Sequence, residues 1–494
     1  MQGGFSEYKK IFKHSAVYGF GNLSSKIVGF VLLPVYMRFL LPSDYGVLEL
    51  ITVTSSILVV ILNLGMNSAI FRSYFNYDEK EKKQDVISTA FFFCLLEAGI
   101  VFVILLSQSS AISNLLFGSE KFTTHVRLMI VTVFFSTAML VPLAVLRAEE
   151  RSFRYITLTV SQVVLMLALN IYFVVVMKLE VLGVLTGTAI ASALVYIAGL
   201  ASLAGKLKRT FSRYELKAML AFGIPLVPAA LANRVLTSAD RYLLKYLTDL
   251  NEVGLYSLGY RISSVMLVFV VQPFMLAWPV VMFRVAKEEG AREIYRNVLT
   301  YYVMVALWVA LALSIFSREI ITVISPPVYH SAYRVVPLLV LSAFFAGAFY
   351  VVSVGLNIER KTGYFPLIIG AAALVNIGAN YILIPAFGMM GAALATAFSQ
   401  LIVVIATWRI SVRYYEVKYD GKRILHIGVA AIVIFTVSRL FALAGLGVMY
   451  SSIVDAVLVL FYPVILYVTG FFNREEREAI SGYFKRLKGK LGLR

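Results

Sequence analysis

Three basic residues stand inside stretches of the sequence that are otherwise apolar enough to cross a membrane. Lys26 lies in NLSSKIVGFVLLPVY (22–36), Arg234 in LANRVLTSAD and Arg261 in LGYRISSVM. A cation at the centre of a bilayer costs at least about 2.5–3.5 kcal/mol on insertion scales, so such side chains face protein or water rather than lipid. Because several cations at this depth make a cavity electropositive, they predict an anion-binding site. The planar guanidinium of arginine suits a phosphate group in particular.

Uncharged polar residues accompany these cations. Asn22 lies four residues before Lys26 and therefore on the same helical face, and Ser56 and Asn63 share a face of the next apolar stretch. Amide and hydroxyl groups on such a face could bind sugar hydroxyls, or they could hydrogen-bond between helices. Both interpretations stay open. The candidate substrate-binding residues are Lys26, Arg234, Arg261, Asn22, Ser56 and Asn63.

Few acidic residues are available to neutralise the cations inside the apolar stretches. Glu49, Glu97 and Asp240 lie there, and local ion pairing is the alternative to an open anion site. Glu49 could neutralise Lys26 or Arg38. A carboxylate in a cavity can also titrate near neutral pH, so these three acids are candidates for coupling transport to Na⁺ or H⁺. The sequence has no Asp-x-Asp motif and no long loop, so we expect no catalytic residue, metal site or cofactor other than a coupling ion.

Composition places the chain in a membrane. Of its 494 residues, 60% are hydrophobic and only 15% are charged, whereas soluble domains contain about 25% charged residues. The net charge of +18 does not indicate a nucleic-acid partner, because the basic residues lie in short loops between apolar runs. The single cysteine, Cys94, stands in an apolar run and is interpreted as a small buried hydrophobe.

The apolar runs predict an all-α integral membrane protein with about fourteen transmembrane helices. A span needs roughly 20 apolar residues. With the N-terminus in the cytoplasm, about three quarters of the 45 basic residues fall on the cytoplasmic side, so we expect both termini there. The first run is long enough to be a retained helix rather than a removed signal peptide. The predicted spans are 15–38, 46–71, 86–107, 127–146, 155–177, 182–204, 219–243, 253–282, 297–317, 335–357, 364–384, 389–408, 424–444 and 450–472.

The two halves of the chain repeat each other at an offset of 208 residues. Gly46 near the start of the second span corresponds to Gly254 near the start of the eighth, and Gly183 corresponds to Gly391. The offset also relates Lys26 to Arg234. Six spans plus six spans predict two parallel-repeat lobes around a central cavity. The predicted domains are an N-terminal lobe (1–210), a C-terminal lobe (211–415), and a helical pair with a basic cytoplasmic tail (416–494).

Two helix junctions resemble those of polysaccharide and oligosaccharide-lipid flippases. They are LLPVYMRFLLPSDYGVLEL (32–50) and LTSADRYLLKYLTDLNEVGLYSLGYRI (236–262). The resemblance implies membership of a superfamily that also contains multidrug and toxin extruders and the flippase for the lipid-linked peptidoglycan precursor. It implies alternating access between two lobes. It further implies that basic cavity residues on spans one and eight, Lys26 and Arg261 here, hold a pyrophosphate.

The substrate implied by this resemblance is an oligosaccharide on undecaprenyl pyrophosphate, moved across a bacterial plasma membrane for cell-surface polysaccharide synthesis. We expect a protein that is not an enzyme and that works as a monomer. Its expected partners are the lipid-linked substrate, membrane lipids and polysaccharide-assembly proteins. The alternatives are a multidrug extruder of the same superfamily, which would present carboxylates to organic cations, and a membrane polysaccharide polymerase or glycosyltransferase.

Overall fold

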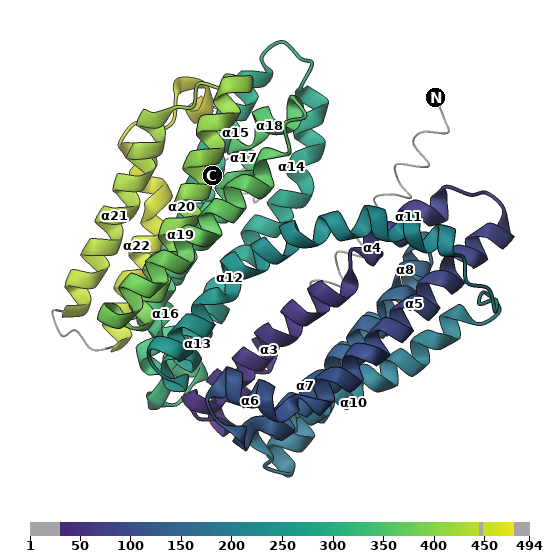
Figure 1. Cartoon of the computed structure of the whole chain (residues 1–494). Coiled ribbons are helices and arrows are strands. Elements are labelled where there is room, and N and C mark those ends of the chain that lie inside the picture. The colour runs from purple at the N-terminus through teal and green to yellow at the C-terminus, as the bar shows by residue number, and fades with distance from the viewer. Residues whose placement is uncertain (1–29, 444–447, 479–494) are drawn as a thin grey trace, which may run out of the picture. The chain divides into compact units, whose positions relative to one another are not determined.

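The computed structural model describes residues 30–443 and 448–478, and every regular element assigned in these ranges is a helix (Figure 1). The α-helices are α2 (Leu33–Phe39), α3 (Pro42–Asn63), α4 (Met66–Phe75), α5 (Lys80–Ser107), α6 (Ser109–Phe117), α7 (Thr123–Ala138), α8 (Leu140–Ala148), α9 (Ser152–Ile171), α10 (Glu180–Leu200), α11 (Arg213–Gly223), α12 (Val227–Leu247), α13 (Leu250–Met266), α14 (Gln272–Val285), α15 (Ala291–Ile315), α16 (Ser317–Ile324), α17 (Val336–Val352), α18 (Val354–Ile358), α19 (Tyr364–Phe387), α20 (Met389–Tyr414), α21 (Gly421–Leu443) and α22 (Val448–Val468). Short 3₁₀ or π segments are η1 (Glu120–Phe122), η2 (Tyr172–Val176), η3 (Ala201–Leu203), η4 (Ile224–Leu226), η5 (Leu267–Val271) and η6 (Pro327–Val335).

Twelve helical segments within the described ranges are long and apolar enough to cross a membrane. They coincide with predicted spans two to thirteen, from Pro42–Phe75 to Gly421–Phe441. Most of the first predicted span, 15–38, lies outside the described residues. The fourteenth corresponds to a shorter apolar stretch of α22, Ser452–Val468. The all-α membrane fold predicted from hydropathy is confirmed.

The second span shows how local sequence sets helix boundaries. Pro42 occupies the first turn of α3, where its missing N–H costs nothing, and the Asp44 carboxylate accepts a hydrogen bond from the Leu41 N–H at 3.1 Å. The helix ends where Leu64 and Gly65 both adopt the left-handed region, with φ of 46° and 70°. The chain then resumes as α4, so this span is broken in two.

The seventh span is longer than predicted and is also broken. It runs from Arg213 to Leu247 rather than over 219–243, and η4 interrupts it between α11 and α12. Pro225 in η4 and Pro228 in the first turn of α12 account for the interruption, because proline cannot donate to the preceding turn. The extension beyond 243 carries Lys245 and buries Leu244. Arg234 therefore lies further from the end of its span than the sequence suggested.

The helices divide into two compact units. The first consists of 1–261, 324–332 and 365–399, and the second of 262–323, 333–364 and 400–494. These units are defined by contacts and are discontinuous in sequence, whereas the predicted lobes were drawn from the repeat. The lobe boundaries after residues 210 and 415 stay a prediction.

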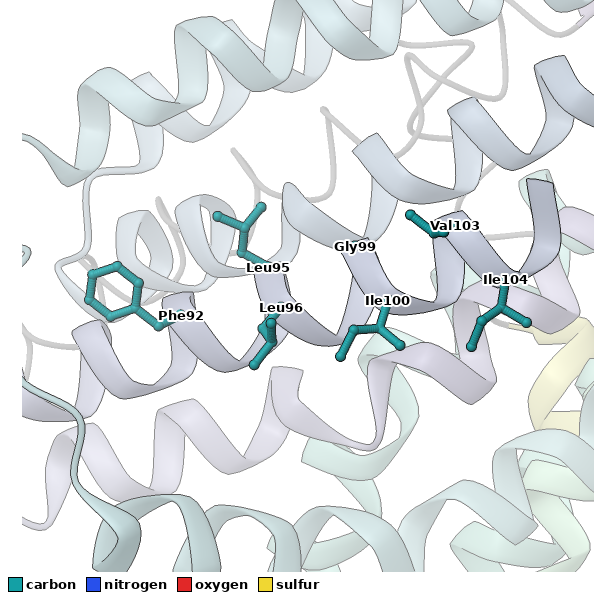
Figure 2. A pocket seen from close by; sticks show the side chains of 7 residues that line it. All are labelled: Phe92, Leu95, Leu96, Gly99, Ile100, Val103 and Ile104. Carbon is teal, nitrogen blue, oxygen red and sulfur yellow. The ribbon is translucent and has the colours of Figure 1, made fainter. Parts of the chain in front are cut away.

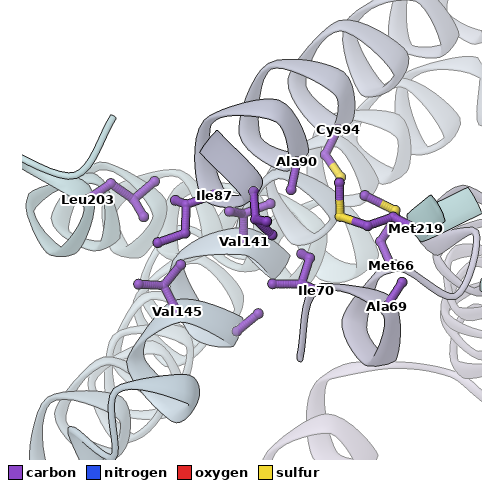
Figure 3. Close-up of a cluster of buried hydrophobic side chains, with 12 residues drawn as sticks. Met66, Ala69, Ile70, Ile87, Ala90, Cys94, Val141, Val145, Leu203 and Met219 are labelled. Carbon is purple, nitrogen blue, oxygen red and sulfur yellow. The ribbon is translucent and has the colours of Figure 1, made fainter. Parts of the chain in front are cut away.

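The first unit contains an apolar core formed by α4, α5, α8, η3 and α11 (Figure 3). Met66, Ile70, Cys94 and Met219 are almost completely buried in it. Cys94 is a free thiol among these side chains, as expected of a small buried hydrophobe. Through this core, α11, which is the first segment of the seventh span, packs against α4 and α5. The position of α12 and its basic residues follows from this attachment.

In the second unit, aromatic side chains donate hydrogen bonds to the backbone of neighbouring helices. The Tyr302 hydroxyl on α15 donates to the Phe344 carbonyl on α17 at 2.9 Å. Trp308 Nε1, also on α15, donates to the Val459 carbonyl on α22 at 2.8 Å. Such donors need a partner when they are removed from water. They fix α15 between α17 and α22.

Candidate functional site

The basic residues of spans seven and eight lie at similar depth. Arg234 is 13 residues before the end of α12 at Leu247, and Arg261 is 11 residues after the start of α13 at Leu250. At 1.5 Å per residue these distances are about 20 Å and 16 Å along the two helices, well inside a hydrocarbon layer of about 30 Å. Lys26 and Asn22 lie outside the described residues, so their predicted roles stay predictions.

Arg261 forms an ion pair with Glu49 on α3. Arg261 Nη2 donates to Glu49 Oε1 at 3.1 Å, and the fully buried Tyr45 interacts with both partners. The Glu49 side chain is 10% exposed and that of Arg261 is 40% exposed. For Arg261, the structure thus shows local pairing, the alternative to an open anion site. The partner is 212 positions away in sequence.

Arg234 differs from Arg261 because it makes no ion pair with any described residue. Its side chain is half-buried on α12, and its recorded hydrogen bond is made by its backbone carbonyl, which accepts from the Thr237 hydroxyl at 3.1 Å. A half-buried guanidinium within a membrane span retains donors for a ligand or water. The role of Arg234 in anion binding stays a prediction.

Asp240 lies in a buried polar network. Its carboxylate accepts from Arg241 Nη1 at 2.9 Å and from the Tyr256 hydroxyl, and Thr396 Oγ1 lies 3.5 Å from Oδ2. The Asp240 and Arg241 side chains are 1% and 4% exposed. A carboxylate with these partners stabilises the contact among α12, α13 and α20, because each partner would otherwise be buried without compensation.

Arg241 is a site residue that the sequence analysis did not select. Its guanidinium lies 4.1 Å from the ring centroid of Tyr260 and 5.5 Å from that of Tyr256. The sequence does indicate a buried Arg241, because the adjacent Asp240 carries the opposite charge. Two opposite charges next to each other reduce the free-energy cost of burying both in an apolar span. Among the described residues, Glu49, Arg261, Asp240 and Arg241 interact as a group of balanced charge. Arg234 on α12 is a further cation that makes no ion pair or hydrogen bond with this group in the described part of the chain.

The predicted polar stripe on α3 bonds within its own span, to α3 and to the start of α4. Ser56 Oγ donates to the Val53 carbonyl at 2.7 Å, and Asn63 Oδ1 accepts from the Asn67 N–H at 3.2 Å. Neither side chain has a recorded contact with Arg261. Thr54 on α3 reaches across to α12, where its hydroxyl lies 2.7 Å from that of Tyr242.

Glu97 on α5 is partly buried, and its Oε2 is buried without a hydrogen-bond partner in the described part of the chain. It lies close enough to Cys94 to interact with it electrostatically. A buried carboxylate oxygen without a hydrogen-bond donor is not compensated for its loss of water. Of the three coupling candidates, Glu97 is thus the one without a guanidinium partner among the described residues.

The described residues also form no metal-binding cluster. No group of three or more His, Cys, Asp or Glu side chains gathers there. A hollow of about 680 Å³ runs along α5, where Figure 2 shows Leu96, Ile100 and Val103 projecting from one helix. Its lining is apolar, so it fits lipid chains and could not hold a charged headgroup.

Comparison with known proteins identifies a family and sequence relatives that match about half of the chain. A family model described as "Polysaccharide biosynthesis protein" matches residues 11–285. Over 263 residues the chain is 26% identical to Lsg locus putative protein 1 of Haemophilus influenzae, a match covering 52% of this chain and 62% of the relative. Over 211 residues it is 28% identical to an uncharacterized membrane protein of Methanocaldococcus jannaschii, covering 40% of each. The chain thus spans less than two thirds of these relatives.

Solved structures match most of the chain. A structure described as "Lipid II flippase MurJ, inward closed conformation" aligns with a TM-score of 0.74 and 14% identity, covering 93% of this chain and 99% of that one. An inward-facing multidrug resistance MATE family transporter of the MOP superfamily aligns with a TM-score of 0.67 and 16% identity, covering 83% and 94%. At such identities the likeness shows the fold alone. The predicted two-lobed transporter fold is confirmed.

Proposed function

Because the chain belongs to the polysaccharide biosynthesis protein family, we propose that it is a flippase for an undecaprenyl-pyrophosphate-linked oligosaccharide, working by alternating access. The family supports the polysaccharide precursor as cargo. The fold supports transport, since flippases and multidrug transporters share it. The observation that carries the proposal is the placement of Arg234 and Arg261 at similar depth within adjacent spans.

Moving a diphosphate through a bilayer is an electrostatic problem. An isolated charged group costs tens of kcal/mol to transfer into a medium of low dielectric, so the headgroup needs cations and water along its path. Arg234 offers a guanidinium without an ion-pair partner in the described ranges, and the partly exposed Arg261 offers one shared with Glu49. In this proposal Lys26 supplies a third cation. The polyprenyl chain stays in the lipid while these side chains hold the phosphates.

The same proposal assigns the chain to the bacterial plasma membrane with both termini in the cytoplasm. The concentration of basic residues in alternate loops supports this orientation. With it, the α2–α3 and α12–α13 turns face the outside. The proposed partners are the lipid-linked substrate, membrane lipids and polysaccharide-assembly proteins. The protein needs no catalytic residue, because the cargo changes sides without a covalent step.

For the coupling ion we propose H⁺, carried by Glu97. Glu49 and Asp240 each already accept a hydrogen bond from a guanidinium, which balances their charge. Glu97 has a buried oxygen without such a partner among the described residues. Protonation would remove the cost of that buried charge, so occupancy by a proton changes the energy of the site around α5.

The second candidate function is a multidrug extruder, which the MATE structural likeness favours. An extruder that binds organic cations needs carboxylates facing its substrate. In the described part of the central helices, Glu49 and Asp240 are both engaged by arginines, and the balance of charge is positive. This balance opposes an organic cation and favours a diphosphate.

One experiment separates the two functions. The full-length protein would be reconstituted into liposomes containing undecaprenyl pyrophosphate that carries a short fluorescent oligosaccharide, and an impermeant reductant would report the fraction on the outer leaflet. We expect protein-dependent redistribution between leaflets and no accumulation of ethidium under the same proton gradient. Ethidium transport without redistribution of the lipid would replace the flippase by the extruder.

A further inference from the structure

We propose that Glu49 is an internal counter-anion of Arg261, that the substrate diphosphate displaces it, and that this exchange releases α3 from α13. The inference rests on the proposed function, because it takes the diphosphate as the competing anion. In this inference, Glu49 controls when the helices separate and does not carry the coupling ion that drives transport. Glu49 thereby couples occupancy of the site to separation of two helix ends.

The exposures of the two partners are suited to such an exchange. The Arg261 side chain is 40% exposed, so a ligand can reach it, whereas the Glu49 side chain is 10% exposed and interacts with the buried Tyr45. The guanidinium donates to the carboxylate through Nη2 at 3.1 Å. A planar guanidinium has five N–H donors and can bind two phosphate oxygens side by side. A diphosphate therefore offers Arg261 more charge and more acceptors than one carboxylate does.

A displaced Glu49 would not be left without a cation nearby. Glu49 also interacts electrostatically with the buried Arg241, which is paired with Asp240. The carboxylate can therefore remain within the field of Arg241 while the diphosphate occupies Arg261. When the diphosphate leaves, the Arg261 guanidinium regains Glu49. Because one anion replaces another, Arg261 is never exposed to the hydrocarbon region without a counter-charge.

The ion pair is one of several contacts between α3 and α13, beside the interaction of Tyr45 with Arg261 and the close approach of two glycines. Gly46 on α3 lies against the Leu250 carbonyl, and Gly254 on α13 lies against the Pro42 carbonyl. Among the described residues, Glu49–Arg261 is the ion pair that links α3 to α13. Loss of it removes a directional contact between two charged groups and so weakens the attachment of α3 to α13. Replacement of Glu49 by the diphosphate thus loosens the contact between the N-terminal parts of α3 and α13.

Binding measurements test the exchange directly. The probe would be farnesyl diphosphate, titrated into full-length protein in nanodiscs, with farnesol as the uncharged comparison. We expect Glu49→Gln to bind the diphosphate about tenfold more tightly than the wild type, because no carboxylate competes for Arg261. Arg261→Gln should bind weakly, and Glu49→Gln combined with Arg261→Gln should show no gain. Glu293→Gln, which removes a surface ion pair with Arg296, is the matched control.

Distances between spin labels test the release of the helices. Labels would be placed at Ser43→Cys and Asn251→Cys, equivalent positions at the starts of α3 and α13, in a Cys94→Ala background. We expect farnesyl diphosphate to lengthen the distance in the otherwise wild-type protein, and Glu49→Gln to show the longer distance without ligand. The wild-type measurement stands even if Glu49→Gln does not fold.

The outcomes distinguish a failure of this inference from a failure of the proposed flippase function. If farnesyl diphosphate binds no better than farnesol, the proposed diphosphate cargo is wrong. If the diphosphate binds but Glu49→Gln leaves both affinity and label distance unchanged, the flippase proposal survives and the counter-anion role of Glu49 is overturned. The counter-anion role is also overturned if bound farnesyl diphosphate leaves the distance between the two labels unchanged in the otherwise wild-type protein.

Discussion

Gly46 and Gly254 are related by the sequence repeat and also by direct packing. Gly46 lies against Leu250, Gly254 lies against Pro42, and the offset of 208 converts each of these contacts into the other, since 42 + 208 = 250 and 46 + 208 = 254. The starts of α3 and α13 therefore meet as two copies of one surface. Such reciprocity is what a two-fold relation between equivalent elements produces.

A second pair of repeated glycines has equivalent surroundings. Gly183 on α10 lies against Phe173 near the end of the preceding helix, and Gly391 on α20 lies against Leu383 near the end of α19. At both places a Cβ would press on the backbone of the preceding span. Close approach of neighbouring spans thus explains why glycine stands at these repeated positions.

The glycine contact between α3 and α13 predicts a loss of stability on substitution. In Gly46→Val or Gly254→Val, the new side chain would overlap a carbonyl of the facing helix. Overpacking of this kind costs about 1–3 kcal/mol, so thermal unfolding of the purified protein should shift to lower temperature. Gly370→Ala is the control, because nothing lies within 4 Å of a Cβ built there. Equal shifts in the control and the test variants would show that the contact has no special importance.

The Asp240–Arg241 pair predicts strong non-additivity. Asp240→Asn or Arg241→Met alone leaves a buried charge without its partner and should cost about 3–5 kcal/mol of stability. The combined change Asp240→Asn with Arg241→Met removes both charges and should cost clearly less than the sum of the two. Denaturation of all four proteins in one detergent measures the coupling. Additive losses would mean that the two charges do not compensate each other.

Glu97 predicts how transport responds to pH. If its carboxylate carries the coupling proton, Glu97→Gln should make the flipping rate in proteoliposomes independent of an imposed pH gradient. The physical reason is that a glutamine cannot bind or release the proton. Glu120→Gln, at an exposed acid in η1, should keep the wild-type response. A persistent response in Glu97→Gln would remove this residue from the coupling step.

Glu476 predicts a pH-dependent attachment of residues 473–478. Burial opposes its ionisation, but hydrogen bonds from Tyr301, the Asn473 N–H and Arg423, together with the Arg423 charge, hold the pKa of Glu476 below its ordinary value. Both Glu476 oxygens lie 2.9–3.0 Å from Arg423 Nη2. Because the pKa is depressed in the folded state, the attachment is at full strength above the ordinary glutamate pKa. It is lost as the pH falls through the lower folded value.

Hydrogen exchange measures this attachment. Corrected for intrinsic rates, amides of residues 473–478 should lose protection between pH 7 and pH 3, and Glu476→Gln should lack protection already at pH 7. Glu478→Gln is the control, because its ion pair with Arg474 is largely exposed. Protection that is the same at both pH values in the wild type would contradict the assignment.

The spans could be predicted from sequence because the bilayer acts as a solvent that selects apolar runs about 20 residues long. The cations could be located for the same reason, since each interrupts such a run. The partner of Arg261 could not be found this way. Glu49 and Arg261 are 212 positions apart and meet through tertiary packing, which periodicity within one helix does not encode.

The breaks in spans two and seven also escaped prediction. Leu64 adopts φ of 46°, and leucine has no intrinsic preference for this left-handed region that would predict it. The interruption at Pro225 lies within a continuous apolar run, so hydropathy does not reveal it. The extension of the span to Leu247, not the break, increased the distance of Arg234 from the end of its span. Adjacent charges such as Asp240 and Arg241 could have been interpreted as a buried pair from their position alone.

The initial flipping rate of undecaprenyl-pyrophosphate-linked oligosaccharide in proteoliposomes tests the central claim most directly. We predict that Arg234→Ala and Arg261→Ala each lower this rate at least about tenfold, since each removes charge-assisted hydrogen bonds to the diphosphate. Arg261→Lys should restore only part of the rate, and Arg284→Ala, at an exposed position near the end of α14, should leave it unchanged. Wild-type rates in both Arg234→Ala and Arg261→Ala would contradict the account.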